Sequence, residues 1–313
     1  MRNFKDYFFL FVKGIGMGAA DVVPGVSGGT IAFITGIYEE LINSIKLLDG
    51  KTLSLFFKLK WSEFWKRING NFLFTVLLGI IISVFSLAKL ISYLLESHSI
   101  KVWSFFFGLV VISAITILRE VKKWNLNIVV MLLMGMGIAY YITIASPATT
   151  PEDWWFVLLS GAIAICAMIL PGISGAFILL ILGKYEYITG ALHDLNISII
   201  VLFILGCVLG LLSFVRVISW VLQKYYYMAV ALLSGFMIGS LNKVWPWKEV
   251  ISFRIDSNGE QVALQDQSIL PTQYFDITGN SPEILQALFF MAIGIGVVVI
   301  VEKISHANEK AKT

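Results

Sequence analysis

A short phrase built from proline, glycine and serine occurs twice inside apolar parts of the chain. One copy runs from Pro24-Gly-Val-Ser-Gly-Gly-Thr30 to Glu39, and the other runs from Pro171-Gly-Ile-Ser-Gly175 to Glu186. At a constant offset of 147, these two 16-residue stretches share nine identities. A Pro-Gly pair breaks a helix, and the helix that restarts presents free backbone N–H groups that attract anions. The phrases therefore predict an anion site whose donors come from Ser27, Gly28, Gly29, Thr30, Ser174 and Gly175, with the tips at Pro24, Gly25, Pro171 and Gly172.

The same glycines have a simpler explanation, since small residues let membrane helices pack closely. The pairs Gly14/Gly18, Gly206/Gly210 and Gly235/Gly239 are spaced for that role. However, breaks at matching points of two halves are typical of a transporter binding site. The duplication therefore favours the binding interpretation for the Pro-Gly phrases.

Lys89 and Arg216 are cations inside long apolar segments, at matching positions of the two halves. A cation in the hydrocarbon is costly unless it faces a cavity or a partner. These side chains are suited to bind a phosphate, which Arg216 can hold with two parallel hydrogen bonds. The alternative is that both side chains snorkel to the membrane interface.

Three carboxylates accompany the phrases. Glu39 and Glu186 follow Gly-x-Tyr and are predicted to end the two short helices, as boundary residues or as partners of the cations. Asp21 lies three residues before Pro24, and its counterpart in the second copy is Met168. Because it is not duplicated, Asp21 is a candidate for binding a coupling ion, H⁺ or Na⁺.

Other chemistries lack the residues they need. The chain has no Gly-x4-Gly-Lys-Ser/Thr loop for a nucleotide, and no histidine lies near the Ser-Gly phrases to act as a base. His98, His193 and His306 are scattered, so we expect no metal site. We expect a protein that is not an enzyme, needs no cofactor and has no nucleic-acid partner.

The composition predicts an all-α polytopic membrane protein. Of 313 residues, 58% are hydrophobic and 14% charged, against roughly 25% charged in soluble domains. Apolar runs divide the chain into two halves, 1–150 and 151–313. The predicted membrane helices cover residues 72–95, 102–118 and 126–144 in the first half and 197–222, 228–241 and 284–301 in the second.

The two halves are an internal duplication. Leu78-Gly79 aligns with Leu205-Gly206, Gly108 with Gly235, and Gly135-Met-Gly137 with Gly294-Ile-Gly296. Each half has an odd number of apolar segments, five when the two short ones around each phrase are included. The second half then enters the membrane from the opposite face, so the repeat is predicted to be inverted.

Positive charges predict the orientation. Fifteen lysines and arginines fall on the side of the N-terminus, the basic loop 46–67 and the C-terminus, and five fall on the other side. Both termini and loop 46–67 are therefore predicted to be cytoplasmic, and the polar loop 243–283 external. The five external cations are Lys101, Lys184, Lys243, Lys248 and Arg254.

The segments after each Pro-Gly are too short to cross the bilayer, which takes about 20 helical residues. We therefore predict two re-entrant helical hairpins, at about residues 7–45 and 154–186, that enter from opposite faces. Two short complete spans at each place would preserve the same loop positions and remain an alternative.

The stretch from Gly18 to Thr30, followed by Gly36-Ile-Tyr-Glu-Glu40, closely resembles the bacterial polyprenyl-phosphate transporter family. Pro171-Gly-Ile-Ser-Gly175 and Gly183-Lys-Tyr-Glu186 resemble its second signature. The resemblance implies a flippase in the bacterial cytoplasmic membrane. Such a protein returns the lipid carrier undecaprenyl phosphate from the outer to the inner leaflet for synthesis of peptidoglycan and other envelope polymers. We expect alternating access, in which the phosphate meets Lys89, Arg216 and both helix N-termini while the lipid tail stays in the bilayer.

Three alternatives compete with this expectation. An ion-coupled carrier of a small soluble anion would share the hairpins but should enclose its cargo. A membrane-embedded lipid-phosphate enzyme would need a nucleophile or a metal cluster. A scaffold for envelope assembly would leave the buried cations without a purpose.

Overall fold

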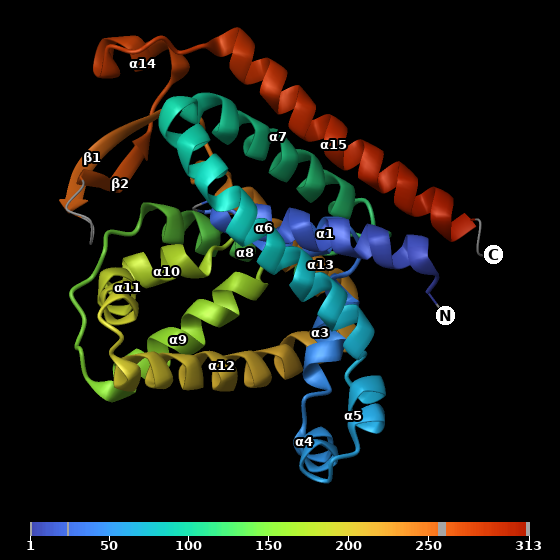
Figure 1. Cartoon of the computed structure of the whole chain (residues 1–313). Coiled ribbons are helices and arrows are strands. Elements are labelled where there is room, and N and C mark those ends of the chain that lie inside the picture. The colour runs from blue at the N-terminus through green and yellow to red at the C-terminus, as the bar shows by residue number, and fades with distance from the viewer. Residues whose placement is uncertain (1, 24, 256–260, 311–313) are drawn as a thin grey trace.

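The computed structural model describes residues 2–23, 25–255 and 261–310, and the predicted tip residue Pro24 lies outside them (Figure 1). The described chain is mostly helical. Its first half contains α1 (Phe4–Val22), α2 (Gly28–Ile34), α3 (Tyr38–Lys46), α4 (Gly50–Phe57), α5 (Trp61–Arg67), α6 (Gly70–Ser97), α7 (Ser99–Leu118) and α8 (Leu126–Ile144). The second half contains α9 (Trp154–Ile169), α10 (Gly175–Ile181), α11 (Tyr185–His193), α12 (Ile197–Lys224), α13 (Tyr226–Gly239), the 3-10 turn η1 (Ser240–Asn242), β1 (Lys248–Ile255), β2 (Gln261–Ser268), α14 (Pro271–Thr278) and α15 (Ile284–Lys310).

Five helices of the described chain are long and apolar enough to cross a membrane, namely α6, α7, α8, α12 and the part of α15 up to Lys303. They match five of the six predicted spans. Their outward faces carry large apolar side chains, such as Phe85 and Leu285, which are 83% and 84% exposed. Water would make that exposure costly, whereas lipid does not.

The sixth predicted span, 228–241, is shorter than a full crossing. It forms α13, which has 14 residues and then tightens into η1. By contrast, α10 and α11 meet at an angle of 109° and count together as one broken or re-entrant span. The range predicted for a hairpin, 154–186, ends in the first turn of α11, so this bent pair extends beyond it.

The prediction of an all-α protein is wrong in the polar loop 243–283. Strands β1 and β2 pair antiparallel there, with Lys248 opposite Ser268, and α14 follows. The alternation of β-branched and aromatic residues with polar ones in Lys248-Glu-Val-Ile-Ser-Phe-Arg-Ile255 favours a strand, although Ile251 and Phe253 are 54% and 59% exposed. Loop 46–67 is also ordered, as α4 and α5, and Asp49 caps α4 by accepting from the N–H of Thr52 at 2.8 Å.

Two glycines end the short helices in the same way. Gly36 and Gly183 have φ of +71° and +61°, a conformation that glycine adopts without steric cost. The N–H of Ile37 bonds back to Ala32 O at 3.0 Å, and the N–H of Lys184 bonds to Leu179 O at 2.8 Å. Both are Schellman endings.

These endings correct the predicted places of Glu39 and Glu186. The two short helices stop before the glycines, and each glutamate lies in the first turn of the next helix, α3 or α11. A carboxylate in a first turn interacts favourably with the positive end of the helix dipole.

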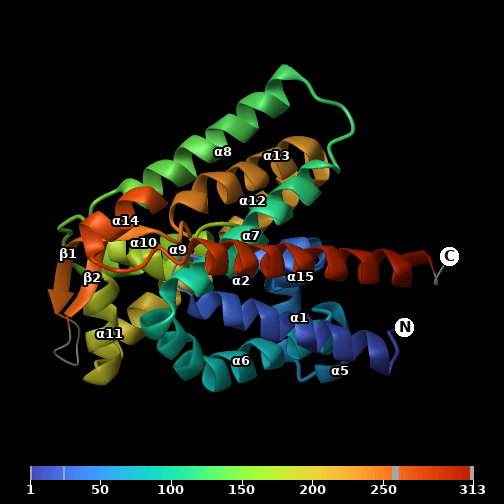
Figure 2. The ribbon, with the colours of Figure 1, turned by 90° about the horizontal axis from the view of Figure 1, so that it is seen from above.

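Four glycines at aligned positions allow two close helix crossings. A Cβ on Gly108 of α7 would collide with backbone of α15, and one on Gly294 of α15 would collide with backbone of α7. Gly135 of α8 and Gly235 of α13 face each other's backbones in the same manner. Each crossing joins a helix of the first half to a helix of the second, and α8 and α13 lie side by side in Figure 2.

The crossing of α1 with α6 and that of α9 with α12 are a second related pair. Gly14 and Gly79 bring α1 against α6, while Gly161 and Gly206 bring α9 against α12. In these positions any side chain would push the helices apart. Both views place the two termini at one end of the molecule and β1 and β2 at the other (Figures 1 and 2).

Candidate functional site

The two Pro-Gly phrases lie against each other, although they are more than 140 residues apart in sequence. The hydroxyl of Ser27 donates to the carbonyl oxygen of Met168 at 2.8 Å. The N–H of Gly172 donates to the hydroxyl oxygen of Thr30 at 2.9 Å. The structure thus brings the predicted residues of both halves into one buried junction, which we call the tip junction.

The donors at the start of α2 are already engaged within the protein. Gly28 N–H donates to the Asp21 carboxylate at 2.6 Å, and Gly29 N–H donates to the Ser27 hydroxyl at 3.0 Å. A Cβ on Gly28 would collide with that carboxylate. Asp21 therefore occupies the place at which the sequence predicts an external anion.

The start of α10 is different. Ser174 is its N-cap and is buried, but within the described chain it makes no side-chain capping bond. The equivalent of Asp21 is the apolar Met168. The tip junction is thus symmetric in its backbone path and asymmetric in its charge.

Gly25 and Gly172 make equivalent turns, each with a φ of +84°. Only glycine takes this conformation routinely. A Cβ on Gly172 would also meet the backbone of Phe236 and Met237, whereas a Cβ on Gly25 would meet the side chain of Lys243. The first turn is therefore covered by a lysine from a distant part of the chain.

A small cavity lies between these turns. Its volume is about 10 Å³, close to the space that one buried water needs. Its polar lining comes from Ser174, Thr143 and Lys243, and the rest of the lining comes from Gly25, Ala139, Ile142, Gly172, Ile173 and Phe177. The tip junction is closed in this structure, with no room for a phosphate.

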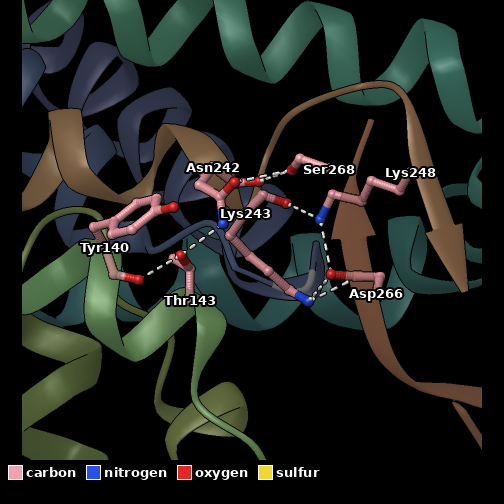
Figure 3. Close-up of polar contacts among 7 residues, drawn as sticks. All are labelled: Tyr140, Thr143, Asn242, Lys243, Lys248, Asp266 and Ser268. Carbon is pink, nitrogen blue, oxygen red and sulfur yellow. Dashed lines mark hydrogen bonds and ion pairs between the residues drawn. The ribbon is translucent and has the colours of Figure 1, made fainter. Parts of the chain in front are cut away.

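Lys243 belongs to a cluster that we call the lysine pair, Lys243 and Lys248, with the carboxylate of Asp266 between them (Figure 3). Lys243 Nζ lies 2.9 Å from Asp266 Oδ2, and Lys248 Nζ lies 3.2 Å from Oδ1. Lys248 also donates to the Lys243 carbonyl oxygen at 2.6 Å. Lys243 Nζ is 4.5 Å from the centre of the Phe177 ring, which gives the cation an aromatic support.

The cluster has unusual electrostatics because it is largely buried. Burial, and then the charge of Lys243, lower the pKa of Lys248 to about 8, although Asp266 opposes the shift. Burial alone would raise the pKa of Asp266, but the two lysines together hold it below its usual value. Among the side chains that the structure describes, one carboxylate faces two ammonium groups, so this cluster carries a net positive charge.

Lys89 and Arg216 lie elsewhere. Both are exposed on the surfaces of α6 and α12, and neither is among the described residues that line the tip cavity. Arg216 donates to the carbonyl oxygen of Leu212 in its own helix. Glu39 and Glu186 are also exposed. The cation that the fold brings to the tips is Lys243 instead.

The sequence did not reveal Lys243 as a residue of the tip site, because the site residues were predicted from positions that match between the two halves. The strands β1 and β2 occur in the second half alone, so their charges have no counterpart to reveal them. One signal was available, since Lys243-Val-Trp-Pro-Trp-Lys248 places two lysines beside aromatic residues directly after an apolar segment. Such a boundary lysine is normally a solvated or snorkelling residue.

Comparison with known proteins places the chain among polyprenyl-phosphate transporters by sequence similarity. Residues 17–262 match the model of a family described as undecaprenyl phosphate translocase-like. A polyprenyl-phosphate transporter of Vibrio cholerae is 45% identical over 95% of this chain and 97% of its own length. A polyprenyl-phosphate transporter of Staphylococcus aureus is 31% identical over 79% of this chain and 88% of its own. No solved structure matches the chain.

The family match begins within α1 and includes the tip junction, both copies of the Pro-Gly phrase and the lysine pair. Asp266 lies just beyond the match, in β2. With these membrane helices and this length of match, the chain belongs to the undecaprenyl phosphate translocase-like family.

Proposed function

We propose that this protein is a multi-pass transporter of the bacterial cytoplasmic membrane that returns polyprenyl phosphate, such as undecaprenyl phosphate, from the outer to the inner leaflet. The observation that carries the proposal is the 45% identity to a polyprenyl-phosphate transporter over 95% of this chain. An identity that high over the whole length leaves little room for a different cargo.

The proposed path for the phosphate passes the tip junction. Broken backbone at membrane depth is tolerated where it is buried in protein or lines a water-filled cavity, and the tips combine such breaks with hydroxyl groups of Ser27, Thr30 and Ser174. The paired glycine crossings support the idea that the two halves are inverted repeats that rock against each other. Because the tip cavity is closed here, this structure would be an occluded state of the cycle.

Asp21 supplies a proposed means of ion coupling. Its carboxylate holds the N–H of Gly28 at 2.6 Å, so a phosphate and Asp21 compete for the same donor. Neutralisation of Asp21 by H⁺, or its recruitment by Na⁺, would free that donor for the phosphate. Glu39 and Glu186 are assigned to the membrane boundary, where both are exposed.

Lys89 and Arg216 remain predicted head-group contacts. Their exposed positions on α6 and α12 suit a phosphate that is still at the protein surface rather than one at the tips. While the phosphate passes the tips, the lipid tail would remain on the apolar, membrane-facing side of the protein.

The test is leaflet exchange of labelled polyprenyl phosphate in liposomes that contain the purified protein. The exchange rate with the wild-type protein should exceed that of protein-free vesicles. An imposed ion gradient should change the exchange rate of Asp21→Asn less than that of wild type. Lys89→Ala and Arg216→Ala should slow exchange, while Lys58→Ala, an exposed cation of loop 46–67, should not. Exchange equal to that of empty vesicles would reject transport, and unchanged rates in the two cation variants would reject only their assignment.

A further inference from the structure

A groove between α8 and α13 ends beside the lysine pair. Its volume is about 400 Å³, and it is lined by Met136, Gly137, Tyr140, Ile238, Gly239 and Asn242. Typical ligand sites occupy roughly 300–1,000 Å³ and are mostly apolar with a few polar groups at defined places. Apart from Asn242 and the tyrosine hydroxyl, this lining is apolar, so the groove suits a hydrocarbon chain.

Asn242 joins the groove to the charged cluster. Its Nδ2 donates to the Thr143 hydroxyl at 2.8 Å, and its Oδ1 accepts from the Ser268 hydroxyl at 2.9 Å (Figure 3). The next residue is Lys243. Thr143 in turn lines the tip cavity. The groove, the lysine pair and the tip junction are thus in contact through neighbouring side chains.

The charges at this end of the groove favour the binding of an anion. The Lys243 and Lys248 side chains are only 12% and 10% exposed, and the Asp266 side chain is 23% exposed. In the described part of this cluster, two sheltered cations face one carboxylate, which leaves a net positive charge. A phosphate monoester, which carries close to two negative charges at neutral pH, would match both ammonium groups.

We propose that the groove holds the first isoprene units of a polyprenyl phosphate while its phosphate binds Lys243 and Lys248 in the place that Asp266 occupies in this structure. The inference rests on the proposed transport function and adds a binding site on the β1–β2 side of the protein. Asp266 then competes with the phosphate for the two lysines. It leaves them when the phosphate binds and pairs with them again when the phosphate moves on to the tips.

Gly137 gives a test of the tail site. No described atom lies within 4 Å of a Cβ built on Gly137, and the same holds for Gly296, its aligned position on α15. Leucine favours a helix more than glycine does, so both variants should fold. Gly137→Leu should weaken binding roughly tenfold, the effect of excluding about two methylene groups from an apolar site. Gly296→Leu is the matched control and should bind as wild type does.

Asp266→Asn tests the head-group site. The variant removes the competing charge without changing the size of the side chain, so affinity for polyprenyl phosphate should rise by about three- to tenfold. The double variant Lys243→Gln/Lys248→Gln should lose that affinity. Binding is measured on the purified full-length protein in nanodiscs with radiolabelled polyprenyl phosphate, against unlabelled polyprenol and phosphatidylglycerol as competitors.

The outcomes separate this site from the transport function. Equal affinity in Gly137→Leu and Gly296→Leu, no gain in Asp266→Asn, or equal competition by phosphatidylglycerol would overturn the site, even if wild-type liposomes exchange the lipid. Conversely, the expected binding pattern together with no leaflet exchange by wild type would reject transport and leave the binding site standing.

Discussion

At the residue scale, Lys248 has a pKa well below the usual value of a lysine, mainly because it is buried. It faces Lys243 and Asp266, rests 5.4 Å from the centre of the Trp103 ring and has a pKa of about 8. A lysine of this kind is charged at neutral pH but loses its proton within one or two pH units above it. Its contribution to anion binding is therefore sensitive to pH.

We predict that affinity for polyprenyl phosphate falls as the pH rises from 7 to 9. The phosphate stays doubly charged in this range because its second pKa is about 6, whereas Lys248 of the free protein becomes neutral. Binding then requires proton uptake, and affinity drops by up to about tenfold per pH unit above the pKa. Lys248→Arg keeps its charge and should flatten the dependence. Binding curves at constant ionic strength check this, and an equally steep fall in the arginine variant would contradict it.

Gly172 should be far less tolerant of a side chain than Gly36. Both have positive φ, so alanine at either costs about 1–2 kcal/mol of conformational strain. At Gly172 the new Cβ also collides with the backbone of α13, which adds about 1–3 kcal/mol. Thermal unfolding in detergent should show a clearly larger loss for Gly172→Ala than for Gly36→Ala. Equal losses of stability would mean that the backbone around Gly172 shifts to accommodate the new Cβ without a cost in free energy.

At the scale of elements, the glycine crossings carry the contacts between the two halves. Helices α7 with α15, and α8 with α13, approach closely because aligned glycines face the backbone of the opposite helix. Because lipid is as apolar as the helix surfaces, no hydrophobic effect drives the helices together, and close van der Waals packing must stabilise their association instead. These crossings are therefore close packing contacts between the two halves.

Gly135 and Gly137 are two residues apart on α8, but substitution by leucine should lower the stability of the protein only at Gly135. At Gly135 a side chain meets the backbone of α13, whereas at Gly137 it meets open space. Gly135→Leu should therefore lower the melting temperature and the yield of monodisperse protein, and Gly137→Leu should leave both unchanged. Size-exclusion profiles after heating measure this, and a stable Gly135→Leu variant would contradict the packing argument.

For the whole molecule, the fold separates the two termini from the strands β1 and β2. The termini lie at one end and β1 and β2 at the other (Figures 1 and 2). The basic loop with α4 and α5 was predicted to share the side of the termini because cytoplasmic loops collect lysine and arginine. The proposed binding site would then open on the external side, from which the cargo must be collected.

Cysteine labelling on intact cells tests this orientation. After replacement of Cys166 and Cys207, we expect an impermeant maleimide to label Gln273→Cys in α14 but neither Lys58→Cys nor Lys5→Cys. All three residues are exposed, so access depends on the side of the membrane alone. Permeabilised cells provide the positive control for all three positions. Labelling of Lys58→Cys on intact cells would reverse the proposed topology.

Local features of the fold could be read from the sequence. The long apolar runs became the five long helices, and the repeated Pro-Gly and Gly-x-Tyr-Glu elements became turns with positive φ at Gly25, Gly172, Gly36 and Gly183. Such features depend on a few adjacent residues. The resemblance of the same motifs to a known family also predicted polyprenyl phosphate as the cargo.

What the sequence determined by itself was the membrane-spanning class, the broken helices at two matching points and the family. Only the tertiary structure decided which groups meet there. It placed Asp21 on the donors of α2, left Lys89 and Arg216 on outer surfaces, brought Lys243 to the tips and paired it with Asp266. The physical reason is that helix breaks follow from local backbone preferences, whereas ion pairs depend on the rotation of each helix and on distant segments that fold back.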